Sequence, residues 1–152
     1  MYKLIIIASF AFVCLTSFDQ VPLRQKKFNI SNGLALQGYD PVAYFVNNKA
    51  LKGKKEINVY FEGIIYYFSN TNNKEVFLKN PKQYEPQYGG WCAYAMGASG
   101  EKVEIDPETF KIIDNKLFLF YHTWVNNTLV KWNKDEMNLH AKADANWIKL
   151  YK

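Results

Sequence analysis

The chain has 152 residues, of which 49% are apolar, 17% aromatic and 22% charged. This length supports one domain with its own core, and the density of large apolar rings excludes disordered, collagen-like and coiled-coil proteins. The formal charge of +5 is a small excess spread along the chain, and it predicts no nucleic-acid partner.

The N-terminus predicts export. A short basic start at residues 1–3 precedes an apolar run of about 12 residues, 4–15, whereas a helix that spans a bilayer needs ~20. We therefore interpret residues 1–17 as a secretory signal peptide, which predicts a secreted or periplasmic protein without stable membrane insertion after cleavage. An uncleaved anchor and a lipoprotein attached through Cys14 are the alternatives.

The mature chain divides into a polar segment and a domain. Residues 18–32 are polar with a basic step, so we interpret them as a tether, and residues 33–152 form the domain. At its start, residues 34–38 predict a short strand. Asp40 before Pro41 predicts a helical turn, because Asp caps helices and Pro favours their first position.

Two β-hairpins are predicted from strand-like apolar segments separated by turn residues. Gly63 supplies the positive φ of the first turn, and Asp114 with Asn115 tolerates the left-handed backbone of the second. The predicted strands are 58–61 and 64–68 in the first hairpin, and 110–113 and 116–121 in the second.

Helices are predicted between the hairpins and in the C-terminal third. Asn70 or Thr71 caps the first, which ends before Pro81 because the residue before a proline avoids the helical conformation. The others comprise residues 91–96, stopped by Gly97 and Gly100, a segment opened by Thr123, and a last helix capped by Asp135. Hairpins packed against several short helices predict a single domain of the α+β class.

Several motifs follow one another along the mature chain. They are Gly38-Tyr39-Asp40-Pro41-Val42-Ala43-Tyr44-Phe45, Tyr66-Tyr67-Phe68-Ser69, Phe77-Leu78-Lys79-Asn80-Pro81 and Gln87-Tyr88-Gly89-Gly90-Trp91-Cys92. In this order they resemble the YHS domain family, and in particular its exported, stand-alone members. The resemblance covers roughly residues 32–150.

The resemblance also implies what this chain lacks. Many YHS domains bind metals through cysteines placed after Asp-Pro-Val and in a Phe-Cys-Ser-x-x-Cys turn. At or near these places the chain has Ala43, Ser69 and Asn73, none of which replaces a thiolate at a soft-metal site. The resemblance therefore implies the family's fold without its usual metal site.

A different metal site is the leading hypothesis for function. Cys92 precedes a short predicted helix, and Met96 lies four residues later, which places both sulfur atoms on one helix face. With the imidazole of His122, or of His140 as the second choice, these ligands suit a transition metal, copper first. We expect His140 to be exposed to solvent.

Two other functions remain open for the same thiol. In the first alternative, Cys92 is a small buried hydrophobe in a non-catalytic structural or protein-interaction domain. In the second, Cys92 acts with His122 and either Asp106 or Asp114 in a thiol-dependent enzyme. No local motif supports catalysis, so we expect no enzymatic activity.

Aromatic rings with polar tips are abundant near the Gly89-Gly90 pair. Tyr and Trp side chains suit half-exposed clefts and interfaces. Four of these rings are candidates for lining a pocket for a small molecule or a protein: Tyr39, Tyr88, Trp91 and Tyr94.

Overall fold

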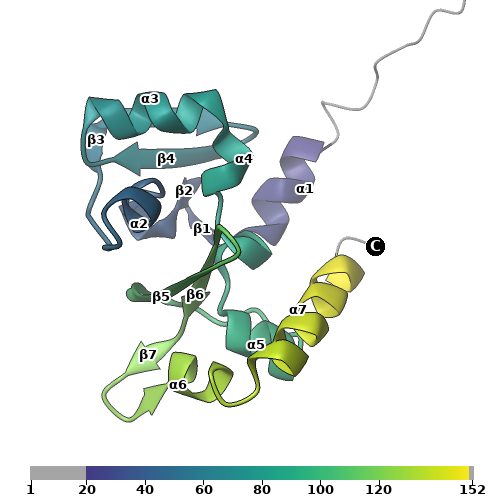
Figure 1. Cartoon of the computed structure of the whole chain (residues 1–152). Helices are drawn as coiled ribbons and strands as arrows, with labels where there is room; N and C mark the ends of the chain where they lie inside the picture. Colours follow the sequence, from purple (N-terminus) through teal and green to yellow (C-terminus); the bar gives the residue numbers. More distant parts are fainter. Residues whose placement is uncertain (1–19, 151–152) are drawn as a thin grey trace, which may run out of the picture.

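The two predicted hairpins form the framework of an α+β fold, as the sequence analysis expected (Figure 1). The computed structural model describes residues 20–150, so the predicted signal peptide and its alternatives lie outside the described residues. The elements are α1 Gln20–Lys27, β1 Ile30–Ser31, β2 Leu34–Ala35, the 3-10 turn η1 Leu36–Gly38, α2 Ala43–Val46, β3 Lys54–Phe61, β4 Ile64–Phe68, α3 Thr71–Lys79, α4 Pro81–Tyr84, the 3-10 turn η2 Gln87–Gly90, α5 Ala93–Ala98, β5 Asp106–Ile113, β6 Lys116–Phe120, β7 His122–Thr123, β8 Asn126–Asn127, α6 Thr128–Trp132 and α7 Glu136–Leu150.

The first hairpin, β3–β4, belongs to a four-stranded sheet of order β1-β2-β4-β3. Its turn has the predicted left-handed backbone, with φ of 45° at Glu62 and 89° at Gly63. Helix α3 packs along this hairpin (Figure 1). As predicted, Asn70 caps α3, because its side chain accepts a hydrogen bond of 2.8 Å from the Asn73 N–H.

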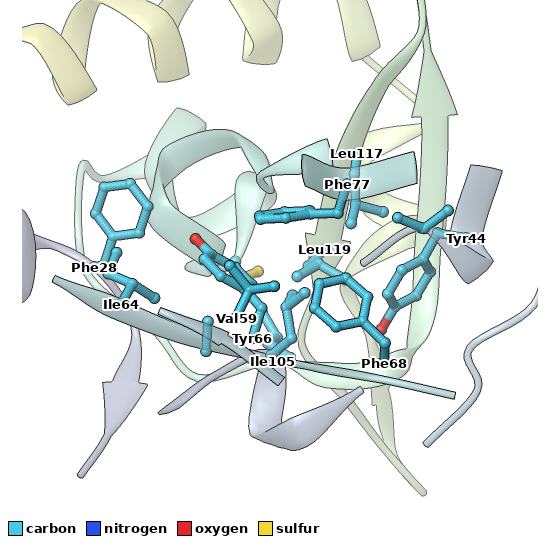
Figure 2. Packing of buried hydrophobic residues seen from close by; sticks show 14 residues of the cluster. Phe28, Tyr44, Val59, Ile64, Tyr66, Phe68, Phe77, Ile105, Leu117 and Leu119 are labelled. Carbon is cyan, nitrogen blue, oxygen red and sulfur yellow. The ribbon is translucent and has the colours of Figure 1, made fainter. Parts of the chain in front are cut away.

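The second hairpin, β5–β6, joins two halves of the core. Strand β6 is buried on both faces, and its side chains alternate between two hydrophobic clusters because successive residues of a strand point to opposite faces. Leu117 and Leu119 pack in the first cluster, together with Tyr66, Phe68 and Phe77 (Figure 2). The β6 residues of the second cluster are Phe118 and Phe120, which lie beside Met96 and Trp132.

The segment expected to be a polar tether is part of the fold from Gln20 onward. Residues 20–27 form α1, and Phe28 is buried in the first cluster. The guanidinium of Arg24 forms an ion pair with Glu85 and lies 4.5 Å from the centroid of the Phe28 ring. The expectation was wrong because the polar residues of this segment find buried partners that are distant in sequence.

Three local expectations also need correction. The strand predicted at residues 34–38 ends at Ala35, because Leu36 and Gln37 take positive φ values of 55° and 51°. Gly97 lies inside α5 rather than stopping it. A Cβ atom on Gly97 would lie 2.4 Å from the backbone oxygen of Leu139, so glycine allows the close approach of α7.

The helix predicted to open at Thr123 is the third correction. His122 to Asn127 form a small hairpin, and helix α6 begins only at Thr128. The last helix, α7, begins directly after Asp135, where the sequence predicted it. Among residues 20–150, no helix has both the length and the apolarity that crossing a bilayer requires.

Candidate functional site: the β7–β8 hairpin and its anchor at Cys92

Cys92 lies in the hydrophobic core directly before α5, and its side chain is 0% exposed. The Sγ atom accepts a hydrogen bond of 3.3 Å from the backbone N–H of Tyr121 and lies 3.4 Å from the hydroxyl oxygen of Thr128. Tyr121 and Thr128 flank the β7–β8 hairpin on its two sides. The thiol therefore anchors the base of this hairpin.

The three residues of the metal hypothesis have different surroundings. Met96 is fully buried in the second cluster, whereas Cys92 belongs to the first. The His122 side chain is 42% exposed, and its Nδ1 atom lies 3.3 Å from an oxygen of Asp106. Within residues 20–150, no group of three or more His, Cys, Asp and Glu side chains is arranged to hold a metal ion.

The second-choice ligand, His140, is less exposed than expected. Its side chain on α7 is 27% exposed, and its Nε2 atom lies 3.7 Å from an oxygen of Asp144. Its ring also packs edge-on against Phe118, with 5.0 Å between centroids. His140 therefore belongs to the margin of the second cluster.

The residue types of the thiol-enzyme alternative are only partly brought together. Nδ1 of His122 lies 3.0 Å from the Thr109 hydroxyl, which in turn donates to Asp106 across 2.8 Å. Asp114 is far along the hairpin, in the β5–β6 turn. The Cys92 thiol is buried, and its Sγ atom contacts Tyr121 and Thr128 at the base of the hairpin. It therefore does not face an open cleft, as the nucleophile of an enzyme would.

Ala43, Ser69 and Asn73 surround a buried carboxylate, that of Asp40. One oxygen of Asp40 accepts hydrogen bonds from the Val42 and Ala43 N–H groups, at 2.9 and 3.2 Å. The other accepts from the N–H and hydroxyl of Ser69, at 2.8 and 2.6 Å, and from the Asn73 amide at 2.7 Å. These five bonds tie the start of α2, the end of β4 and α3 together.

The four rings proposed as a pocket serve separate contacts. Tyr88 is buried and donates to Asp144 across 2.9 Å, and its pKa is raised, first by burial and then by this hydrogen bond. The Trp91 indole donates to the Lys27 carbonyl, and the Tyr94 ring lies 5.8 Å from the Lys131 ammonium. The Tyr39 hydroxyl lies 3.3 Å from a Glu108 oxygen, and the pKa of Tyr39 is raised by partial burial and by that carboxylate.

Only Tyr88 among these four rings lines the cavity between α1, η2 and α7. That cavity has a volume of about 250 Å³, and Arg24, Glu85 and Trp147 lie on its walls. The four rings therefore do not line this cavity together, as the sequence analysis expected of a shared pocket.

The most exposed apolar side chains lie at the tip of the β7–β8 hairpin, which the sequence analysis assigned to a helix. Trp124 is 101% exposed and Val125 is 88% exposed. The hairpin pairs Thr123 with Asn126, and the Asn127 side chain accepts hydrogen bonds from the first N–H groups of α6. The Asn126-Asn127 pair was the signal for a turn and a helix cap at this place.

Comparisons with models of protein families, with curated proteins and with solved structures find no match for this chain. The similarity to YHS domains therefore stays a prediction from the motifs given above.

Proposed function

We propose that this chain is an exported, non-catalytic protein-interaction module that inserts Trp124 and Val125 into an apolar pocket of a partner protein. The observation that carries the proposal is the full exposure of Trp124 on a hairpin whose base is fixed to the core. Trp is the residue type most enriched among the side chains that dominate binding energy at protein interfaces.

The hairpin supports this role because it is anchored before any partner binds. Thr128 donates both its backbone N–H and its hydroxyl to the Tyr121 carbonyl, at 3.0 and 2.8 Å. Cys92 contacts both residues, and His122 is held by Asp106. A side chain presented by an ordered loop loses little conformational freedom when it binds, which favours affinity.

The chemistry of the tip favours a protein over a membrane surface. The exposed indole of Trp124 and methyl groups of Val125 are flanked in sequence by the uncharged polar residues Thr123 and Asn126, and residues 117–130 contain no Lys or Arg. An apolar centre with a neutral hydrogen-bonding rim is the usual composition of a protein interface. Peripheral membrane binding generally combines apolar side chains with adjacent basic residues.

Site-specific crosslinking tests the proposal. A photoreactive amino acid at position 125 in the exported full-length protein identifies the partner, which is then purified for affinity measurements. We expect Trp124→Ala to weaken binding by about tenfold or more, the usual loss for a dominant interface residue. The matched control is Tyr60→Ala, because Tyr60 is an aromatic residue exposed to 64% on the distant strand β3.

The outcomes distinguish a protein partner of the hairpin tip from a membrane surface. Equal affinities of the wild-type protein and Trp124→Ala for the crosslinked partner would overturn the proposal. Flotation with anionic phospholipid vesicles that depends on Trp124, without a crosslinked protein, would assign the tip to a membrane surface instead. Both variants should keep the wild-type unfolding midpoint, because neither side chain is buried.

A further inference from the structure

A second surface, which shares no residue with the hairpin tip, has the features of a small-molecule site. A cavity of about 260 Å³ lies between the β1–β2 segment with η1 on one side and Gly90, Glu104 and Ile105 on the other. A more open hollow of about 500 Å³ adjoins it and reaches Tyr67. The two hollows share the lining residues Ser31, Leu34 and Gln37.

We call the two hollows together the polar groove, with Asn29, Ser31, Asn32, Gln37, Tyr67 and Glu104 as its polar residues. The larger hollow, of about 500 Å³, falls in the range of ~300–1,000 Å³ that is usual for small-molecule sites. Its lining also includes the aliphatic side chains of Ile30, Leu34 and Ile105.

The walls of the groove are held in place by hydrogen bonds. The Asn29 N–H donates to the Gly89 carbonyl across 2.9 Å, and its side-chain amide donates to Gly90 and to Glu104 at 3.2 and 3.1 Å. The Gln37 amide donates to the Ile105 carbonyl across 3.0 Å. Side-chain hydrogen bonds thus connect segments that lie more than 60 residues apart in sequence.

One wall is built on an unusual backbone. Leu36 and Gln37 are consecutive non-glycine residues with φ of 55° and 51°. Such conformations are disfavoured and are enriched at ligand-binding sites. Here this turn closes one side of the cavity, since both residues line it.

The groove has unused donors as well as unused acceptors, because the hydroxyls of Ser31 and Tyr67 and the side-chain amide of Asn32 make no hydrogen bond with other described residues. The hydrogen bonds given above use the amide nitrogens of Asn29 and Gln37 and one oxygen of Glu104. Among the described residues, none donates to the remaining side-chain oxygens of these three groups, so they are available to a ligand. The matching ligand therefore carries both hydrogen-bond donors and acceptors.

The charges of the lining residues restrict which ligands the polar groove can bind. None of the residues described as lining the groove is Lys or Arg, and Glu104 contributes a carboxylate, so an anion would be repelled. An organic ammonium ion is usually enclosed by several aromatic faces. The groove has a single aromatic ring, that of Tyr67.

We propose that the polar groove binds a neutral saccharide of one or two rings. Sugar hydroxyls donate to the oxygens of Asn29, Gln37 and Glu104 and accept from the hydroxyls of Ser31 and Tyr67, and the C–H face of a ring packs on the aliphatic side chains and the Tyr67 ring. Binding is non-covalent, and the proposal goes beyond the protein-interaction function because it concerns different residues.

Titration monitored by NMR tests the proposal. The isotope-labelled protein, produced from the full-length sequence, is titrated with glucose, galactose, maltose, cellobiose and N,N′-diacetylchitobiose. Galacturonic acid and tetramethylammonium chloride are the anionic and cationic comparison probes. We expect at least one neutral sugar to shift the amide signals of residues 29–37 and 104–105 at millimolar concentration, and neither charged probe to shift them.

Two variants and a matched control locate the site. Glu104→Gln keeps the shape of the side chain, and we expect about a tenfold loss of affinity because a hydrogen bond to a charged group is weakened. Gln37→Asn shortens the side chain by one methylene group, and asparagine tolerates the positive φ of this position. We expect a similar loss of affinity. Glu101→Gln changes a nearby carboxylate that does not line the groove, and affinity should be unchanged.

Each result decides the proposal. A neutral sugar that binds the groove and weakens with Glu104→Gln supports it. It is overturned when no neutral sugar shifts the groove signals, when the shifts lie elsewhere, or when tetramethylammonium binds as well as the sugars. A wild-type spectrum for each variant away from the groove confirms that a lost interaction is not a lost fold.

Discussion

The backbone N–H of Tyr121 donates a hydrogen bond of 3.3 Å to the Sγ atom of Cys92. A residue that the sequence suggested as a metal ligand or nucleophile thus supports the loop that carries the most exposed aromatic ring of the described chain. The buried thiol contacts both residues that flank the hairpin, so it supports the position of the exposed tip.

The first prediction concerns the reactivity of this thiol. Since the Cys92 side chain is 0% exposed, we expect a thiol-reactive dye to label it in native protein only as fast as the hairpin base opens. Labelling should become rapid in denaturant. Peptide mapping assigns the labelled cysteine, and fast native labelling of Cys92 would show that the thiol is accessible.

The second prediction concerns copper. Cys92 and Met96 are buried in different hydrophobic clusters, and His122 is partly exposed beside Asp106. We therefore expect Cys92→Ala to leave the copper affinity of the protein unchanged. Competition with a chelator measures this affinity for Cu(I) and Cu(II). A tight one-to-one site that disappears in Cys92→Ala would contradict the expectation and restore the metal hypothesis, with Met96 and His122 as the next substitutions.

The third prediction concerns the buried carboxylate of Asp40. Asp40→Ala leaves five hydrogen-bond donors without their acceptor, so we expect a loss of about 3 kcal/mol or more in the free energy of unfolding. Urea unfolding measures it. Glu75→Ala, on the exposed side of α3, is the control and should change stability by less than about 0.5 kcal/mol. Equal stabilities of the two variants would refute the role of Asp40.

The fourth prediction concerns the docking of α1. Removal of the Arg24 guanidinium leaves the Glu85 carboxylate, whose side chain is 10% exposed, without its cation. We expect Arg24→Ala to destabilise the domain by about 3 kcal/mol, as for other broken buried ion pairs. Lys26→Ala, at an exposed position of the same helix, should have little effect. A wild-type stability of Arg24→Ala would show that the ion pair with Glu85 does not stabilise the domain.

The fifth prediction concerns alkaline pH. Burial raises the pKa of Tyr44, Tyr66 and Tyr88, and the contacts of Tyr66 with Glu85 and of Tyr88 with Asp144 raise it further. Below the ordinary pKa of 10.0 these phenols are neutral in both the folded and the unfolded chain. Above it the unfolded chain loses protons first, so stability falls as pH rises, by up to about 1.4 kcal/mol per pH unit for each tyrosine.

Urea unfolding between pH 8 and pH 11 checks this expectation. The decline above the ordinary pKa should become less steep in Tyr44→Phe, which removes one of the three titrating hydroxyl groups. A free energy of unfolding that stays constant over this range would contradict the raised pKa values.

The turns could be predicted from the sequence because their chemistry is local. Gly63 and the Asp114-Asn115 pair specify a left-handed backbone by themselves, and the structure confirms both hairpins. The helix expected from Thr123 was wrong because Val125, Leu129 and Trp132 have helical spacing, although only Leu129 and Trp132 lie in helix α6 and Val125 lies at the tip of the β7–β8 hairpin. The competing signal was Asn126-Asn127, which closes β8 and caps α6.

The sites were less predictable because they depend on contacts between distant residues. Asp40 meets Ser69 and Asn73 across intervals of 29 and 33 residues. The polar groove joins Asn29 to Glu104, an interval of 75 residues. Composition and periodicity report which face of an element is buried, but they do not report which distant element covers it.

Strand β6 has a consequence for how the protein unfolds. Leu119 contributes to one hydrophobic cluster and Phe118 to the other, so neither cluster can open without exposing apolar side chains of the same strand. The two clusters should therefore melt in one cooperative step, with the β6 amides among the slowest to exchange hydrogen. A protease cut in the β5–β6 turn would for the same reason leave two fragments that stay together until the whole domain unfolds.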